Sequence, residues 1–222
     1  MPETLLKKRM EKHMTEKKSR GRFIVFEGID GAGKTTQIKL LAQKLQEAGR
    51  QVYCTAEPTE SVSGGLLRDA LGGVSKRTTC ELAAMFVLDR IFHNVNPVHG
   101  IEKMLSDGID VICDRYYYSS LAYQGSDTDA KWVRDMNLNC PEIRCPDLCI
   151  FLDLTPEQSM ARIDAGRVTK EIYESCERLE RVRNQFYRVF EELKGRDRIA
   201  IINAAPGVEE IHREILRVVE EI

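Results

Sequence analysis

The glycine-rich segment at 28–35 constrains the fold of this chain more than any other feature of the sequence. It reads GIDGAGKT and matches the phosphate-binding pattern GxxxxGK[ST] at every specified position. An apolar run at 23–27 precedes it, and an amphipathic stretch with Ile38, Leu41 and Leu45 on one face follows it. A motif between an expected strand and an expected helix predicts a phosphate-binding loop in a parallel α/β fold.

The residue types in this loop suit a nucleoside triphosphate. Backbone N–H groups can curl around phosphate oxygens, and the start of the following helix adds partial positive charge. Lys34 would reach the β- and γ-phosphates, and the Thr35 hydroxyl would ligate Mg²⁺. We therefore predict that ATP is bound by Gly28, Ile29, Asp30, Gly31, Ala32, Gly33, Lys34, Thr35 and Thr36.

Four more apolar runs alternate with helical stretches further along the chain. They have the length of buried strands and lie at 51–55, 111–113, 148–153 and 198–202. With the run at 23–27, they predict a three-layer fold: a five-stranded parallel sheet flanked by helices on both faces. Ligands of such sheets bind beyond the carboxyl ends of the strands.

Charge divides the chain into a basic extension, 1–20, and one expected domain, 21–222. The extension holds seven lysines or arginines and three glutamates, whereas the whole chain of 222 residues has a net charge of −2. A solvated arm is the expected state of the extension, and contact with nucleic acid or a membrane is the alternative. Without an overall basic excess, we expect no stable nucleic-acid partner.

The sequence carries no signal that would direct it to a membrane or out of the cell. No apolar run approaches the roughly 18 residues that span a bilayer, and the first 20 residues lack an apolar centre. The chain has seven cysteines, and an odd number favours reduced thiols. The cluster of Cys140, Cys145 and Cys149 has no fourth ligand nearby, so it does not match a structural zinc site. These features predict a cytoplasmic protein without membrane contact.

Candidate residues for the acceptor of a phosphoryl group follow the other strands. Asp114 and Arg115 end the third run, where Asp114 can hold Mg²⁺ through water and Arg115 can clamp an anion. Phe86 and Arg90 lie four residues apart, so they share one face of an expected helix. On that face, the Phe86 ring can stack on a base and Arg90 can donate to the carbonyl oxygens of the base. An ordinary amphipathic face is the alternative for this pair.

The charge that develops in phosphoryl transfer requires further cations. Arg162 and Arg167 flank Gly166 between two expected helices, where a mobile lid over 162–173 could form. A solvated loop is the alternative. A GTPase would carry an Asn-Lys-x-Asp element after a late strand, and an ATPase motor is usually larger, so the chain favours a small kinase.

Three segments resemble thymidylate kinases, a group of P-loop nucleoside monophosphate kinases. They read FEGIDGAGKTTQ (26–37), DRYYYSSLAYQG (114–125) and PDLCIFLDLTPE (146–157), and the resemblance covers about 22–222. It implies a P-loop kinase fold and Mg²⁺-dependent transfer of the ATP γ-phosphoryl group to dTMP, giving dTDP and ADP for dTTP biosynthesis. It also implies a homodimer formed through a helix like 79–95.

The resemblance implies roles for individual residues at the reacting centre. The catalytic set would be Asp30, Lys34, Arg115 and a lid arginine, either Arg162 or Arg167. The lid supplies this arginine because Gly31 stands where other members carry an arginine in the phosphate loop. The Mg²⁺ ligands would be Thr35, Asp114 and Asp30.

The resemblance further implies that dTMP contacts Glu57, Arg68, Phe86, Arg90, Arg115, Ser120, Tyr123 and Gln124. Ser120 would read the N3 edge of thymine, and Tyr123 would pack against the deoxyribose. Many bacterial members have an arginine where this chain has Ala56, and Arg68 and Arg115 could compensate. Ala56 leaves one alternative open, a kinase of another nucleotide or small molecule. The basic extension and the odd number of cysteines leave a second one open, a nucleotide-binding regulatory protein with little turnover.

Overall fold

The computed structural model describes residues 19–166 and 176–222. Arg167 and most of the predicted lid lie outside the described residues, as does nearly all of the predicted extension. Within the described part, five parallel strands form one sheet in the order β2-β3-β1-β4-β5. The strands are Phe23–Glu27 (β1), Val52–Ala56 (β2), Asp110–Asp114 (β3), Leu148–Asp153 (β4) and Ile199–Asn203 (β5). Each agrees with a predicted run to within one residue at either end.

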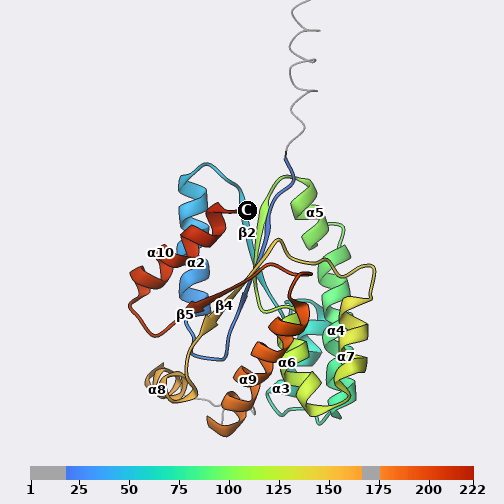
Figure 1. The fold of residues 1–222 in the computed structure, drawn as a ribbon. Coiled ribbons are helices and arrows are strands. Elements are labelled where there is room, and N and C mark those ends of the chain that lie inside the picture. Colours follow the sequence, from blue (N-terminus) through green and yellow to red (C-terminus); the bar gives the residue numbers. More distant parts are fainter. Residues whose placement is uncertain (1–18, 167–175) are drawn as a thin grey trace, which may run out of the picture.

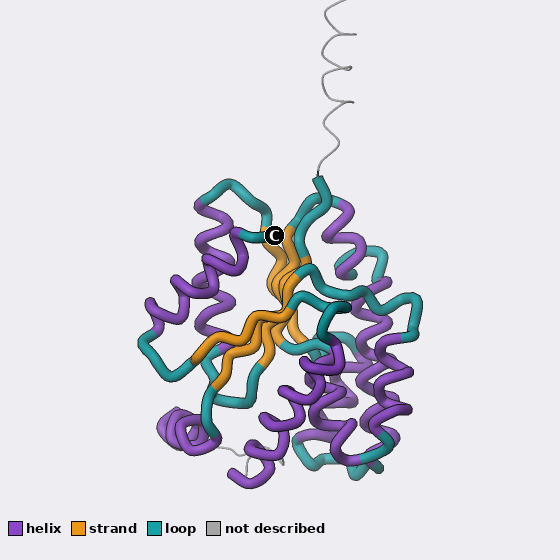
Figure 2. Tube along the Cα trace, in the orientation of Figure 1, coloured by secondary structure: helices purple, strands orange, loops and turns teal. Residues whose placement is uncertain are grey.

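Helices cover both faces of the sheet (Figures 1 and 2). One face packs against α2 (Lys34–Glu47) and α10 (Val208–Glu220). The other face carries α4 (Thr79–Val95), α5 (Ile101–Ser106), α6 (Tyr117–Asp127), α7 (Ala130–Leu138) and α9 (Cys176–Leu193). Two further helices, α3 (Val62–Leu71) and α8 (Pro156–Gly166), lie at the end where the strands finish. The predicted fold class is confirmed.

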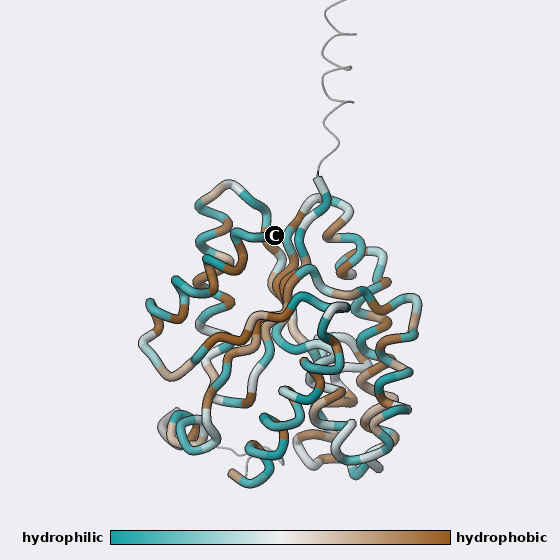
Figure 3. Tube along the Cα trace, in the orientation of Figure 1, coloured by the Kyte–Doolittle hydropathy of each residue, from teal (hydrophilic) through white to brown (hydrophobic). Residues whose placement is uncertain are grey.

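Alternation along β1 explains why the chain needs both layers of helices. Phe23 and Val25 enter the core under α6 and α9, whereas Ile24 and Phe26 enter the core under α2 and α10. All five residues of β1 are buried, so the strand is a continuous apolar run up to its last residue, Glu27. The central strands accordingly form the brown centre of Figure 3.

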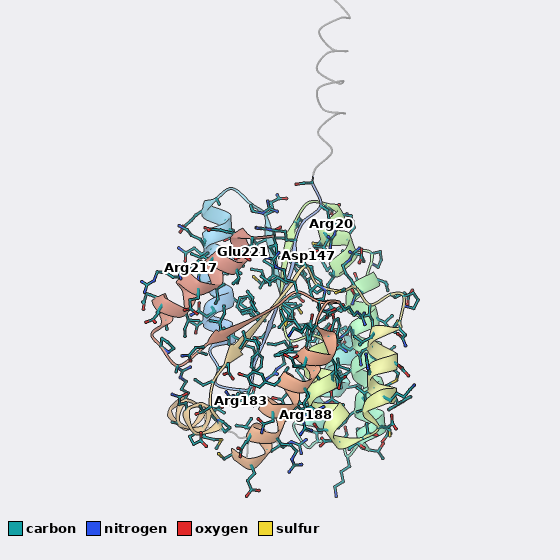
Figure 4. All side chains as sticks on the ribbon, viewed as in Figure 1. Arg20, Asp147, Arg183, Arg188, Arg217 and Glu221 are labelled. Atoms are coloured by element: carbon teal, nitrogen blue, oxygen red, sulfur yellow. The ribbon has the colours of Figure 1, made fainter. Side chains whose placement is uncertain are left out.

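The described chain begins at the end of the sheet opposite to the phosphate loop. Arg20 and Asp147 form an ion pair of 3.2 Å beside the first residues of β1 and β4 (Figure 4). Parallel strands share one carboxyl end, so the loop after β1 lies at the far edge of the sheet from this pair.

Residues 19–166 and 176–222 contain neither a membrane-spanning helix nor a cluster of metal ligands. No helix there has both the length and the apolar character that a membrane span requires. No group of three or more His, Cys, Asp or Glu side chains is arranged there to hold a metal ion. Cys149, from the predicted cysteine cluster, is a fully buried core residue of β4.

Candidate active site

The phosphate loop joins β1 to α2 and packs tightly against β4 and α8. Gly28 has φ +145° and Gly31 has φ +76°. A Cβ atom on Gly28 would lie 2.7 Å from the Leu152 carbonyl oxygen, and one on Gly31 would lie 2.9 Å from the Ser159 carbonyl oxygen. Glycine at both positions therefore permits the backbone angles and the close approach of the neighbouring chain.

Lys34 is the first residue of α2, and its side chain folds back over the loop. Its Nζ atom donates to the carbonyl oxygen of Gly28 at 3.0 Å, and only 7% of the residue is exposed. Burial lowers the pKa of Lys34 and Arg115 adds to this effect, whereas Asp114, Asp30 and Glu27 oppose it. The Nζ atom is thus held against the carbonyl oxygens of Gly28 and Ile29, so the buried amine lies at the loop that would bind phosphate.

A cavity of about 780 Å³ opens beside the loop. Six of the predicted ATP-binding residues line it: Asp30, Gly31, Gly33, Lys34, Thr35 and Thr36. The side chains of Ile29 and Ala32 instead enter the two cores, one on each face of the sheet. The same cavity is lined by Glu57, Arg68, Phe86, Arg90, Arg115, Tyr123, Gln124 and Arg162. The structure thus brings together predicted residues of the donor and acceptor sides.

Asp30 and Arg115 both line this cavity and form an ion pair there. The Arg115 Nη2 atom donates to Asp30 Oδ1 at 2.5 Å, and the guanidinium lies 5.5 Å from the centre of the Tyr123 ring. Burial by itself lowers the pKa of Arg115, but the charge of Asp30 and other acidic neighbours outweighs it and raises the pKa. Arg115 therefore presents a permanent cation at the junction of the two halves of the cavity.

Asp114 and Thr35 line the cavity together. The Oδ1 atom of Asp114 is buried and has no hydrogen-bond partner among the described residues. A buried carboxylate oxygen without a donor is costly unless a cation or water meets it, and Mg²⁺ prefers carboxylate and hydroxyl oxygens. The residues present therefore fit a magnesium site that uses few protein ligands.

Arg90 is buried at the opposite side of the cavity, with 1% exposure. Its Nε atom donates to Glu57 Oε2 at 2.8 Å, its Nη1 atom donates to Asn137 Oδ1, and its Nη2 atom donates to Ser120 Oγ at 3.2 Å. The other Glu57 oxygen lies 3.0 Å from His93 Nδ1. The guanidinium is thus held from several sides in one orientation, which is the condition for directional binding of a base.

Ser120 and Glu57, both predicted to contact the acceptor, make their closest contacts with Arg90. Ser120 is 1% exposed and stands outside the set of residues that line the cavity, because its hydroxyl faces the guanidinium. Glu57 does line the cavity, but its carboxylate is occupied by Arg90 and His93. In this structure both residues orient Arg90.

The loop after Glu57 is fixed by Asp89, the residue before Arg90. Its carboxylate accepts the Thr59 N–H at 2.8 Å and the Ser63 hydroxyl at 2.7 Å. Arg68 from α3 donates to the Thr59 carbonyl oxygen at 2.5 Å. The Arg68 guanidinium is therefore held at the cavity wall near Ala56.

Arg162 joins α8 to the phosphate loop. Its Nη1 atom lies 3.4 Å from the Gly31 carbonyl oxygen, and its Nη2 atom donates to the Ala204 carbonyl oxygen at 2.9 Å. The Ser159 hydroxyl donates to the carbonyl oxygen of Asp30 from the same helix. This arginine is thus in contact with the loop backbone, whereas Arg167 lies outside the described residues.

Several residues of the site carried no usable sequence signal. Asn137 comes from α7 and meets Arg90 only through tertiary packing. Ser159 looks like any polar residue of a surface helix until α8 is docked. Glu27 is different, because a carboxylate that ends an otherwise apolar strand is an observable signal. Burial raises the pKa of Glu27, and the charge of Arg115 is the largest effect that opposes the rise.

Comparisons with known proteins agree with this geometry. The family model described as "Thymidylate kinase" matches residues 26–215. A "Probable thymidylate kinase" of Pyrococcus horikoshii is 39% identical over 207 residues, which cover 90% of this chain and 97% of that protein. One of Methanococcus aeolicus is 39% identical over 203 residues, covering 88% and 94% of the two chains.

A further relative is similar over almost the same length of the chain. A "Thymidylate kinase" of Desulfotalea psychrophila is 35% identical over 204 residues, which cover 91% of this chain and 96% of that protein. These matches span the phosphate loop and both sides of the cavity, so they concern the whole fold and not one motif. Together with the family model, they show that this chain belongs to the thymidylate kinase family.

Proposed function

We propose that this protein transfers the γ-phosphoryl group of ATP to dTMP, giving dTDP and ADP. The observation that carries the proposal is that one cavity is lined both by the phosphate loop and by Phe86, Arg90 and Gln124. A bound triphosphate and a bound nucleoside monophosphate would meet beside Arg115. Holding both reactants in this way converts the transfer into an intramolecular step.

On the donor side, the loop amides and Lys34 would bind the ATP phosphates. Thr35 and Asp114, with Asp30, would hold Mg²⁺, which neutralises charge on the phosphates when it is bound. Asp30 already accepts a hydrogen bond from Arg115, so the carboxylate also orients the cation at the reacting centre. Arg162 supports this half of the site through its contact with the loop backbone.

On the acceptor side, Arg90 would donate to a carbonyl oxygen of thymine, and Phe86 would stack on the ring. Arg115 would contact the acceptor phosphate, with Arg68 as the second cation, because Ala56 offers no charge. Tyr123 and Gln124 complete this part of the cavity wall. The roles of Arg167 and the lid, the division at residue 20 and the cytoplasmic location stay predictions.

A panel of acceptors tests the proposal. Purified protein is mixed with ATP and Mg²⁺ and, in separate reactions, with dTMP, dUMP, dCMP, dGMP or dAMP, and ADP release is recorded. We expect the highest kcat/KM with dTMP and a lower value with dUMP, which lacks the methyl group. ADP release with none of them would contradict the proposal and favour another acceptor or a regulatory protein.

We also propose a homodimer formed through α4. Leu88, Phe92 and Val95 are 60%, 44% and 44% exposed, and their spacing puts them on one face of this helix. A contiguous apolar stripe on the outside of a protein is typical of an interface. A second copy of the same face would cover the stripe by two-fold symmetry.

Replacing Phe92 by glutamate should convert the dimer to a monomer, because two carboxylates would be buried in the symmetric contact. Light scattering after size-exclusion chromatography measures the mass of each variant. Val208→Glu, on α10 behind the sheet, is the matched control and should leave the mass unchanged. An unchanged dimer in the Phe92→Glu protein, or a monomeric parent protein, would contradict the proposed interface.

A further inference from the structure

A buried carboxylate lies directly behind the phosphate loop. Glu27 is the last residue of β1, immediately before Gly28, and none of it is exposed. Its Oε1 atom accepts the Tyr116 N–H at 2.9 Å and the Ser119 N–H at 3.1 Å, and its Oε2 atom accepts the Ser119 hydroxyl at 2.7 Å. Helix α6 has no side-chain cap of its own at Tyr116, so Glu27 supplies these acceptors from another element.

Ser119 connects this carboxylate to Arg115. The Ser119 Oγ atom accepts a hydrogen bond from Arg115 Nη1 at 3.0 Å. A guanidinium can only donate, so a lone pair of the hydroxyl must face Arg115. The hydroxyl hydrogen is then available for Glu27, which gives the contacts one direction: Arg115 donates to Ser119, and Ser119 donates to Glu27.

The end of β1 also fixes the backbone at Arg115. Arg115 has φ +68°, a left-handed conformation that is unfavourable for a residue with a side chain. Its N–H donates to the Phe26 carbonyl oxygen at 2.9 Å, and the next N–H, of Tyr116, is the one that Glu27 accepts. The last two residues of β1 therefore hold the peptide groups on both sides of this unusual conformation.

We propose that Glu27 is a positioning residue that aims Arg115 at the phosphate loop through Ser119 and the Tyr116 amide. The far end of the chain of contacts is Asp30, 2.5 Å from Arg115 Nη2. Without Glu27 and Ser119, the guanidinium keeps its charge but loses the contact that fixes its Nη1 side. The inference rests on the proposed function, because it assigns Glu27 to the phosphoryl-transfer step.

Ser119→Ala tests the proposal with the smallest change, since Glu27 keeps both backbone donors. We expect kcat with dTMP to fall about tenfold or more, as for a lost hydrogen bond to a charged group, while KM for ATP stays the same. Glu27→Gln keeps one oxygen for the two backbone N–H groups but replaces the acceptor of the Ser119 hydroxyl with an NH2 donor, so it should have a similar effect. Tyr118→Phe is the matched control on α6, because its hydroxyl contacts Asp197 instead, and it should leave kcat unchanged.

A double-mutant cycle separates this role from a general effect on stability. In an Arg115→Ala protein, whose residual transfer is measured with radiolabelled ATP, adding Ser119→Ala should cost no further activity, because both changes act through one guanidinium. Additive losses, or full kcat in the Ser119→Ala protein, would overturn the proposal. The unsubstituted protein is assayed first, so a failure of the proposed function itself would appear as no transfer to any acceptor.

Discussion

Replacing Lys34 by alanine is expected to lower kcat for phosphoryl transfer by about 10²–10³-fold, the usual cost of removing a preorganised electrostatic contact to the transition state. The Nζ atom lies inside the phosphate loop, 3.0 Å from the Gly28 carbonyl oxygen, where phosphate oxygens would bind. A fixed cation at that point stabilises the charge of the transferred group without reorganisation. The measurement is ADP release at saturating ATP and dTMP.

Lys44→Ala is the matched control for this change. Lys44 lies in the last turn of the same helix, α2, with 57% of its side chain exposed. Its removal should leave kcat unchanged and take away the same charge from the protein. Thermal unfolding of both variants shows whether α2 still packs. Full turnover by a folded Lys34→Ala protein would disprove the assignment of the phosphate loop.

Arg90→Met is expected to raise KM for dTMP by about 10–100-fold, which corresponds to the loss of one hydrogen bond from a charged donor. KM for ATP should hardly change, because Arg90 belongs to the side of the cavity away from the loop. The methionine keeps much of the side-chain volume in a buried site. Initial rates with each substrate varied in turn give the two constants, and equal increases in both would exclude Arg90 from the base pocket.

The same change leaves Glu57 buried without its main partner, which could unfold the protein. The matched control is therefore the double variant Arg90→Met with Glu57→Gln, in which no unpaired carboxylate remains beside His93. It should regain thermal stability but keep the raised KM for dTMP. Recovery of the original KM in the double variant would mean that the single change acted through Glu57 and not through the acceptor.

The strands and the phosphate loop could be predicted from the sequence because their causes are local. A strand buried on both faces needs a continuous apolar run, and the loop needs glycines where β4 and α8 approach it closely. The roles of Ser120 and Glu57 could not be predicted in the same way. Both side chains are turned toward Arg90, and that orientation depends on how α4 packs against α6 and against the segment that follows β2.

The sequence by itself determined the parallel α/β fold, the phosphate loop with Lys34, and which edge of the sheet holds the site. These follow from periodicity and from residue types at fixed spacing, which act over a few residues. Only the tertiary structure decided that Asn137 orients Arg90, that Ser159 supports the loop, and that Glu27 lies behind Arg115. Such contacts join residues that are distant in the chain, and a buried polar group finds its partner only when the core closes around both.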